Sequence, residues 1–358
     1  MNIGVFHNLY GEFSRGGAET AVEMALKDLR ADGHQVFLIT TKPRGAKPLA
    51  PPVPADLKIY YLDSKFYNLA EISITARLFW HLSNIFSWQK YQKIKKILAT
   101  EKPDLVITHN LMGLGFLTPP AIRSLKIKQA HFLHDIQLLH PSGLMLWGQE
   151  KKIDSLGAKI YQILTRALFA SPAKVISPSA WLLELHKQHG FFKDSEYEIR
   201  PFVWPKTEPI LSRQSARGKN FLFIGQIEEQ KGIFLLINAF KKIIAPDCRL
   251  TVAIRGGGQK IAAAKKSAAD DKRIEFLGPL SYEETEKLKA VSDCLIVPSL
   301  CYENSPTTIY GARAAGLPVI AAAIGGIPEI VGPSDTLFRP GDENDLREKM
   351  TRFIKKEF

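Results

Sequence analysis

The chain has 358 residues, of which 45% are apolar and 23% are charged, a composition typical of a globular protein. Because a single hydrophobic core seldom grows beyond about 250 to 300 residues, this length predicts two domains. No run approaches the roughly 18 apolar residues of a membrane-spanning helix, and no secretory leader precedes the first apolar run, so we expect a cytoplasmic protein. The cysteines Cys248, Cys294 and Cys301 lack a C-x-x-C spacing and are expected to be reduced packing residues.

The net charge of +12 is compatible with a nucleic-acid binder, a protein on anionic lipid, or an enzyme with anionic ligands. No basic and aromatic nucleic-acid motif is present, which disfavours the first class. The basic run from Lys90 to Lys102 has helical spacing and fits either a solvated helix face or membrane contact. Residues 76–96 combine apolar and basic side chains, so they fit either a core-packed helix or a helix on the inner face of an anionic membrane.

In chain order, short apolar runs alternate with amphipathic stretches in both halves. In the first half we expect strands at 3–7, 36–40, 57–62, 105–109, 129–134 and 174–177, and helices at 18–31, 71–98, 154–170 and 180–190. In the second half we expect strands at 221–225, 250–255, 274–277, 294–297 and 319–322, and helices at 232–244, 261–269, 282–291, 307–315 and from Asp342.

This alternation predicts an α/β protein with two Rossmann-like parallel-sheet domains. The predicted domains are residues 1–200 and 220–358, joined by a linker at 201–219 that is rich in proline and charge. Ligands of this fold class bind at the carboxyl ends of parallel strands, so we expect the two domains to face a central cleft lined by loops that follow strands.

In the first half, polar residues follow three expected strands. Gly16 and Gly17 precede a helix and leave room for an anion, although a double glycine also fits a plain tight turn. His134 and Asp135 end one strand, and His109 ends the strand before it, which favours a shared substrate site over a purely structural role. We expect no metal site, because His131 and His134 point to opposite faces of a strand.

In the second half, Lys231 stands at a helix start, where a cation is unfavourable unless an anion lies nearby; a plain exposed lysine is the alternative. Glu303 lies between a buried strand and a helix start, where it fits either a sugar-binding carboxylate or a helix cap. The backbone N–H groups of Thr307 and Thr308 at that helix start suit a diphosphate.

These parts resemble, over nearly the whole chain, the family 4 retaining glycosyltransferases of GT-B architecture. The resemblance is carried by G-G-A-E from Gly16, G-H-Q-V from Gly33, the pair His134-Asp135, F-I-G-Q-I-E-E-Q-K-G from Phe223, and A-A-G-L-P-V-I-A from Ala314 followed by G-G-I-P-E.

The resemblance implies retaining transfer of a hexose from a UDP- or GDP-linked sugar to a glycan or lipid-linked acceptor, in surface polysaccharide or glycolipid synthesis, without a cofactor or metal. It implies catalytic roles for His134, Glu303 and Lys231 and acceptor contacts from His109 and Asp135. The donor-binding residues that it implies are Gly16, Gly17, Gly225, Gln226, Lys231, Leu277, Glu303, Thr307, Thr308 and Gly311.

The chain departs from the family pattern at two donor-site positions. Gln226 stands where many members have arginine, and Gly311 stands where the pattern has a second glutamate. A lost charged hydrogen bond costs about 1.5 to 3 kcal/mol, so activity is expected to be weakened, and a non-catalytic homologue that binds sugar or a partner enzyme is the alternative. The chain also ends at Phe358, whereas family members commonly continue with a helix that returns to the first domain.

Overall fold

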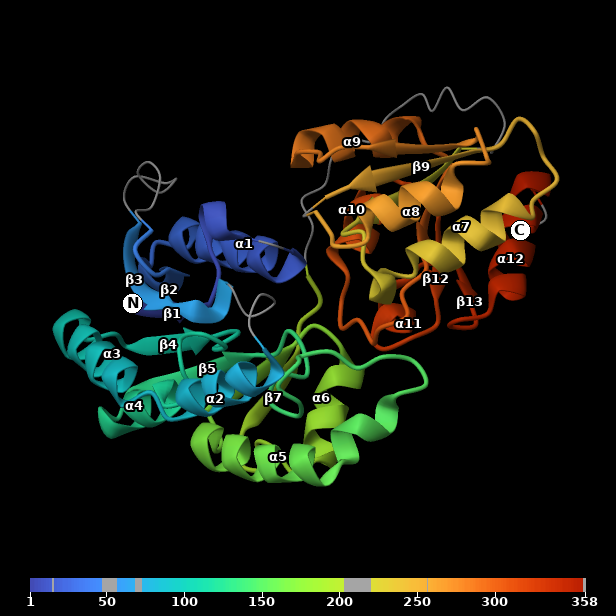
Figure 1. The fold of residues 1–358 in the computed structure, drawn as a ribbon. Coiled ribbons are helices and arrows are strands. Elements are labelled where there is room, and N and C mark those ends of the chain that lie inside the picture. Colours follow the sequence, from blue (N-terminus) through green and yellow to red (C-terminus); the bar gives the residue numbers. More distant parts are fainter. Residues whose placement is uncertain (15, 47–56, 68–72, 203–219, 256, 357–358) are drawn as a thin grey trace. The chain divides into compact units, whose positions relative to one another are not determined.

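A computed structural model describes residues 1–14, 16–46, 57–67, 73–202, 220–255 and 257–356. The chain forms two compact units (Figure 1). The first comprises Met1–Leu144 and Lys151–Arg200, and the second comprises Met145–Glu150 and Pro201–Phe358. The sequence did not predict that Met145–Glu150 belongs to the second unit. Most of the expected linker at 201–219 lies outside the described residues.

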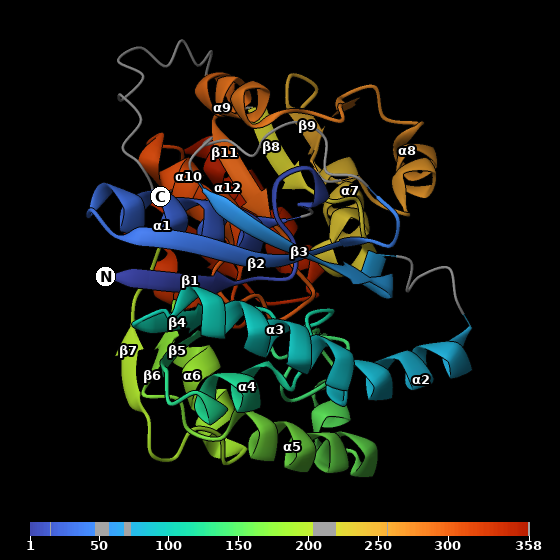
Figure 2. The ribbon, with the colours of Figure 1, turned by 90° about the vertical axis from the view of Figure 1, so that its left-hand side faces the viewer.

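The first unit is built on a parallel sheet with strand order β3-β2-β1-β4-β5-β6-β7. The strands are β1 (Asn2–Phe6), β2 (Gln35–Pro43), β3 (Lys58–Ser64), β4 (Leu105–Thr108), β5 (Lys128–Phe132), β6 (Lys174–Ser177) and β7 (Glu196–Ile199). The helices are α1 (Gly17–Ala31), α2 (Ile74–Ile85), α3 (Trp88–Glu101), α4 (Thr118–Ser124), α5 (Leu156–Phe169) and α6 (Ala180–Gln188). Helix α1 lies on one side of β1 and β2, and α3 and α4 lie on the other (Figures 1 and 2).

The single helix expected at 71–98 is wrong, because the structure has two helices, α2 and α3, in this stretch. The backbone carbonyl of Asn84 accepts a hydrogen bond from the N–H of Phe116, so part of its bonding capacity goes outside the helix. Helix α2 then ends at Ile85, and Ser87 occupies the N-cap position of α3. Strand β7 and helix α4 were not predicted either.

The second unit is a parallel sheet of order β10-β9-β8-β11-β12-β13. Its strands are β8 (Asn220–Gly225), β9 (Arg249–Ile254), β10 (Ile274–Leu277), β11 (Cys294–Val297), β12 (Val319–Ala322) and β13 (Thr336–Phe338). Its helices are α7 (Ile233–Lys241), α8 (Ile261–Ala268), α9 (Tyr282–Val291), α10 (Thr307–Ala314), α11 (Ile327–Ile330) and α12 (Glu343–Lys355). Helix α7 packs against α8 and α12, whereas α10 contacts β11 and β12. Strand β13 and helix α11 were missed because they are short.

The predicted fold class is confirmed, since each unit is a parallel sheet covered by helices. Strand β11 shows why the pattern was readable: all four of its residues are buried, as expected for a central strand covered on both faces. Its end is joined tightly to the start of α7, because Gly232 has a φ of 75° and a Cβ there would lie 1.7 Å from the carbonyl oxygen of Pro298. Only glycine permits this approach, which sets the distance between two site-bearing loops.

Helix α2 directs several apolar side chains outward, so a purely core-packed helix is not what the structure shows. Phe79 is 73% exposed and Phe86, at the end of the helix, is 53% exposed, whereas Ile85 is buried. Trp88 at the start of α3 is 62% exposed. None of the helices in the described ranges has both the length and the apolar character needed to span a bilayer.

Candidate functional site

Three histidines gather where β1, β4 and β5 of the first unit end. His7 directly follows β1, His109 directly follows β4, and His134 lies two residues beyond β5. His109 Nδ1 and His134 Nε2 are 2.8 Å apart, and the ring centroid of His7 is 5.8 Å from both other rings. The structure therefore brings together the predicted residues His109 and His134, and adds His7.

The paired histidines are neutral at pH 7. Burial lowers the pKa of His109 well below its usual range, with further lowering from the neighbouring histidines, and the same causes act on the pKa of His134. One of the two facing nitrogens then carries the proton and donates to the other. Such a pair is a polar surface without net charge.

Asp135 is fixed by two donors beside this group. The Nδ2 of Asn110 donates to Oδ2 of Asp135 at 3.0 Å, and the backbone N–H of Gln137 donates to Oδ1 at 2.7 Å. The side chain of Gln137 also donates to Asn110, which closes a small network. Burial raises the pKa of Asp135 to about 6, against the opposing effect of these two hydrogen bonds. Asp135 is thus a carboxylate that takes up a proton in mildly acidic solution.

The glycine loop before α1 already holds a carboxylate. Gly16 occupies the N-cap position of α1 and Gly17 is its first residue, and the N–H of Gly16 donates to Glu19 Oε2 at 2.7 Å. Glu19 is buried, and its Oε1 lies 3.8 Å from His7 Nε2. Burial opposes ionisation of Glu19, but His7 and the backbone around Gly16 outweigh it and hold the pKa of Glu19 below its usual range. The N–H of Gly16 is therefore occupied by Glu19.

In the second unit, Lys231 and Glu303 form an ion pair. Lys231 Nζ lies 2.8 Å from Glu303 Oε1, and Ser299 Oγ donates to the same oxygen at 2.8 Å. Both donors converge on Oε1, so among the described residues Oε2 is left to accept from a ligand. The sequence placed Lys231 at the opening of a helix; it ends a short 3-10 turn, Glu229–Lys231, just before α7.

This pair changes the acid–base state of its surroundings. Burial disfavours the charged form of Lys231, but the charge of Glu303 outweighs burial and raises the pKa of Lys231 above its usual range. Burial, together with the charge of Glu303, raises the pKa of the nearby Cys301 thiol to about 12. Lys231 therefore stays protonated and Cys301 stays a thiol at pH 7.

Helix α10 begins four residues after Glu303, with its first turn free of acidic residues and with no side-chain cap from Pro306. Thr307 and Thr308 form this first turn, and Gly311 lies buried within the helix. The loop before α10 is held from the other side, since the N–H of Gly326 donates to the carbonyl oxygen of Glu303 at 2.8 Å. The backbone thus fixes Glu303 next to an uncapped helix N-terminus, where anions are stabilised.

The remaining donor-site candidates lie at the same edge of the second sheet. Gly225 is the last residue of β8 and Leu277 is the last residue of β10, and Gln226 follows β8 directly. The carbonyl oxygen of Gly225 accepts from the N–H of Arg255, which joins the ends of β8 and β9.

Sequence reasoning missed Ser299 and His7. Ser299 lies two residues beyond β11, and His7 is the polar residue that ends the first apolar run, so both carry the signal of a polar side chain after a buried strand. Within the described ranges, no group of three or more His, Cys, Asp or Glu side chains is arranged to hold a metal ion.

Comparisons with known proteins agree with this arrangement. Residues 15–200 match the family model described as Glycosyltransferase Family 4, and residues 218–356 match the one described as Glycosyl transferases group 1. An uncharacterized 42.6 kDa protein in the cps region of Klebsiella pneumoniae is 26% identical over 92% of this chain and 87% of its own length. The N-acetyl-alpha-D-glucosaminyl L-malate synthase of Bacillus anthracis is 22% identical over 96% of this chain and 86% of its own length.

Among solved structures, the sucrose-phosphate synthase of Thermosynechococcus elongatus has a TM-score of 0.73 and 19% identity, covering 99% of this chain and 90% of that one. Anabaena Alr3699/HepE in complex with UDP has a TM-score of 0.70 and 17% identity, covering 100% of this chain and 91% of that one. At these identities the structural likeness concerns the fold. The relatives whose names state an activity, in Schizosaccharomyces pombe, Corynebacterium aurimucosum and Bacillus anthracis, are transferases or synthases, so the comparisons do not favour the non-catalytic alternative.

Proposed function

Because the chain belongs to glycosyltransferase family 4, we propose that it moves a hexose, with retention of configuration, from a nucleoside diphosphate sugar to a glycan or lipid-linked acceptor. The donor is UDP- or GDP-linked, and the product belongs to a surface polysaccharide or glycolipid. The relative from the cps region of Klebsiella pneumoniae and the UDP complexes of the Anabaena protein support these choices.

The observation that carries the proposal is the convergence of Lys231 and Ser299 on one oxygen of Glu303, beside the uncapped start of α10. In the proposed reaction, Glu303 accepts from hydroxyls of the transferred hexose through Oε2. Lys231 and the N–H groups of Thr307 and Thr308 neutralise the departing diphosphate. Fixed charges and dipoles aimed at the leaving group are usually the largest single contribution to catalysis of this kind.

We assign the first unit to the acceptor and the second unit to the donor. His134 then contributes near the reacting carbon, with His109 and Asp135 on the acceptor side. Positive charge develops at the anomeric carbon during glycosyl transfer. The neutral state of His134, a result of burial, avoids repelling that charge. Positioning of two substrates accounts for much of the remaining rate enhancement.

The test is release of nucleotide from a panel of UDP- and GDP-sugars, with and without oligosaccharide or lipid acceptors. The anomeric configuration of the product, read by NMR, tests retention. Glu303→Gln is expected to reduce turnover, and Glu343→Gln, which alters a surface ion pair with Lys242, serves as its matched control. Absence of turnover or donor hydrolysis with every donor would overturn the proposal.

We further propose that the protein binds anionic membranes peripherally through α2 and the start of α3. The exposed side chains of Phe79, Phe86 and Trp88 and the exposed Lys93 and Lys96 support this. Wild-type protein is expected to sediment with phosphatidylglycerol vesicles, and the Phe79→Ser/Trp88→Ser variant is expected to remain in solution. Equal sedimentation of both proteins would contradict the assignment of this surface.

A further inference from the structure

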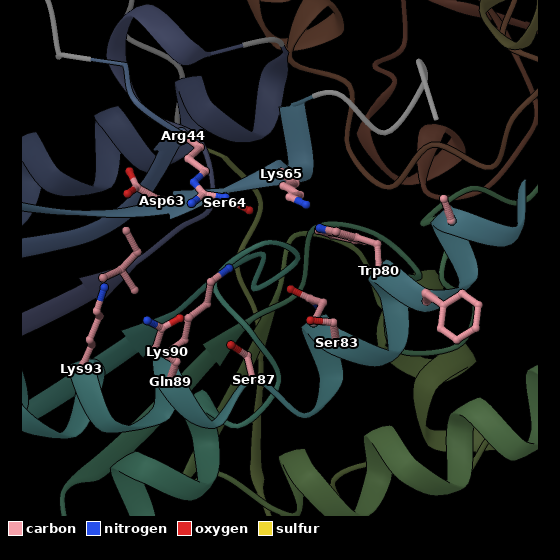
Figure 3. A pocket seen from close by; sticks show the side chains of 14 residues that line it. Arg44, Asp63, Ser64, Lys65, Trp80, Ser83, Ser87, Gln89, Lys90 and Lys93 are labelled. Carbon is pink, nitrogen blue, oxygen red and sulfur yellow. The ribbon is translucent and has the colours of Figure 1, made fainter. Parts of the chain in front are cut away.

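The first unit contains a pocket of about 780 Å³ that none of the assigned donor or acceptor residues lines. It lies between the end of β3, the residue Arg44 after β2, and the facing surfaces of α2 and α3 (Figure 3). Its charged lining residues are Arg44, Asp63, Lys65, Lys90 and Lys93. A volume of this size is typical of a small-molecule site.

The charge of this pocket is strongly positive. Asp63 is its only lining carboxylate among the described residues, and it forms a salt bridge of 3.2 Å with Lys42, which does not line the pocket. Among the described residues, none of the four lining cations, Arg44, Lys65, Lys90 and Lys93, forms a salt bridge. Unpaired cations around a concave surface focus a positive potential into it.

One of the four cations is held inside the protein. Lys90 donates through Nζ to the carbonyl oxygen of Gly113. Burial, followed by the nearby charge of Lys93, lowers the pKa of Lys90 to about 8. Burial makes the charged ammonium group unfavourable in such a place. An anion in the pocket would offset this cost.

Gly113, which accepts the hydrogen bond from Lys90, is itself held in place by its neighbours. Gly113 has a φ of 94°, and a Cβ there would lie 3.1 Å from Ser64 Oγ. The N–H of Gly113 donates to Asn84 Oδ1 at 2.8 Å, and Asn84 is buried. Ser87, which also lines the pocket, makes no capping hydrogen bond through its side chain, and the first turn of α3 has no acidic residue. The pocket thus offers four cations and a hydroxyl at a fixed site, and its one lining carboxylate among the described residues, Asp63, is paired with Lys42.

The loop that carries Gly113 also connects this pocket to the acceptor side of the proposed reaction. It begins directly after His109 and Asn110, at the end of β4. We propose that the pocket binds a phosphate or diphosphate group carried by the acceptor substrate. The identity of the ligand as acceptor rests on the proposed transferase function, whereas the anion site itself does not. Trp80 (Figure 3) provides an apolar side to the pocket for the part of the acceptor next to its phosphate. Phe79 also lines the pocket.

The probe is inorganic pyrophosphate, titrated calorimetrically at low salt. All proteins carry Lys231→Met, so that the proposed donor site is disabled. The test variant adds Arg44→Gln, Lys65→Gln and Lys93→Gln, whose side chains are exposed. The control instead adds Lys27→Gln, Lys128→Gln and Lys193→Gln, which remove the same charge from exposed positions elsewhere in the first unit.

The control is expected to bind pyrophosphate like its parent, and the test variant at least tenfold more weakly, with affinity falling as salt rises. Equal affinity of the test variant and control, or no binding by the parent, would overturn the proposal. Competition separates the sources: displacement of pyrophosphate from the parent by phosphatidylglycerol vesicles indicates a lipid-linked phosphate, and unchanged pyrophosphate binding indicates a soluble one. Failure of the transferase function would appear separately, as absent nucleotide release by the wild type.

Discussion

Replacing Glu303 by glutamine tests whether the ion pair of the second unit serves a ligand or only the fold. The amide keeps one oxygen that accepts from Ser299 and Lys231, so the local geometry is preserved while the negative charge is removed. A hydrogen bond to a charged group contributes about 1.5 to 3 kcal/mol, and a neutral one about 0.5 to 1.5 kcal/mol. The amide NH2 then stands in place of Oε2, so a sugar hydroxyl accepts a neutral hydrogen bond from it instead of donating to a charged oxygen. The difference is about 1 to 1.5 kcal/mol, or roughly a tenfold loss in kcat/KM for the donor.

Stability responds to the same substitution by a different route. The side chains of Lys231 and Glu303 are 31% and 16% exposed, between a surface pair and a fully buried one. Removing one partner is therefore expected to lower the free energy of unfolding by about 1 to 2 kcal/mol. The Lys242–Glu343 pair is more exposed, at 56% and 26%, so Glu343→Gln is expected to change stability by less than about 0.5 kcal/mol and to leave kcat/KM unchanged.

Two assays separate these effects: nucleotide release with the best donor, and urea unfolding. A double-mutant cycle with Lys231→Met measures how far the two residues act as a unit. If Glu303→Gln loses stability but keeps kcat/KM within twofold of the wild type, the carboxylate is structural and the donor-site assignment is wrong. If neither quantity changes, the ion pair has no role in either.

Three further predictions follow from particular geometries. The raised pKa of Asp135 makes its ionised form destabilising, so wild-type stability should fall as pH increases from 4 to 6, whereas that of Asp135→Asn should not. In urea melts, the free energy of unfolding of Asp135→Asn minus that of the wild type should therefore grow over this range, by no more than about 3 kcal/mol. A difference that does not change with pH would contradict this. Gly232→Ala should lower the free energy of unfolding by about 3 kcal/mol or more beyond the loss in Gly148→Ala, measured by thermal unfolding. Both glycines have positive φ, but only a Cβ at Gly232 meets backbone, 1.7 Å from the carbonyl oxygen of Pro298. Equal losses in the two variants would contradict this. Gly311→Glu should raise donor affinity about tenfold in calorimetry relative to Gly311→Ala, which corrects for helix propensity, whereas equal affinities would show that the missing glutamate is not a weakness of this chain.

The parts of the fold that the sequence revealed are those with strong apolar runs. Strand β11 is one such run, and the residue types after it predicted that Glu303 lies between a strand and a helix start, as it does between β11 and α10. The break between α2 and α3 was not predictable from local pattern, because it depends on a hydrogen bond between Asn84 and Phe116, which are distant in sequence.

In the candidate site, too, some features were predictable from the sequence and others depend on contacts between distant residues. The order of strands made it possible to expect His109 and His134 on one edge, because adjacent parallel strands bring their ends together. The sequence did not show that Glu19 binds the N–H of Gly16, since a glutamate early in a helix fits many roles. Nor did it show the convergence on one oxygen of Glu303, which requires the three-dimensional positions of Lys231 and Ser299.

The segment Met145–Glu150 affects how members of this family could be recombined. It forms a β-bridge between Leu146 and Cys301, and Tyr302 bonds back to it through its N–H to Met145 and its hydroxyl to Glu150. These contacts brace the loop that carries Glu303. In a chimera with a single crossover near residue 200, the Glu303 loop would contact residues 145–150 of the other family member. An exchange of donor specificity should therefore include residues 145–150 together with the C-terminal half.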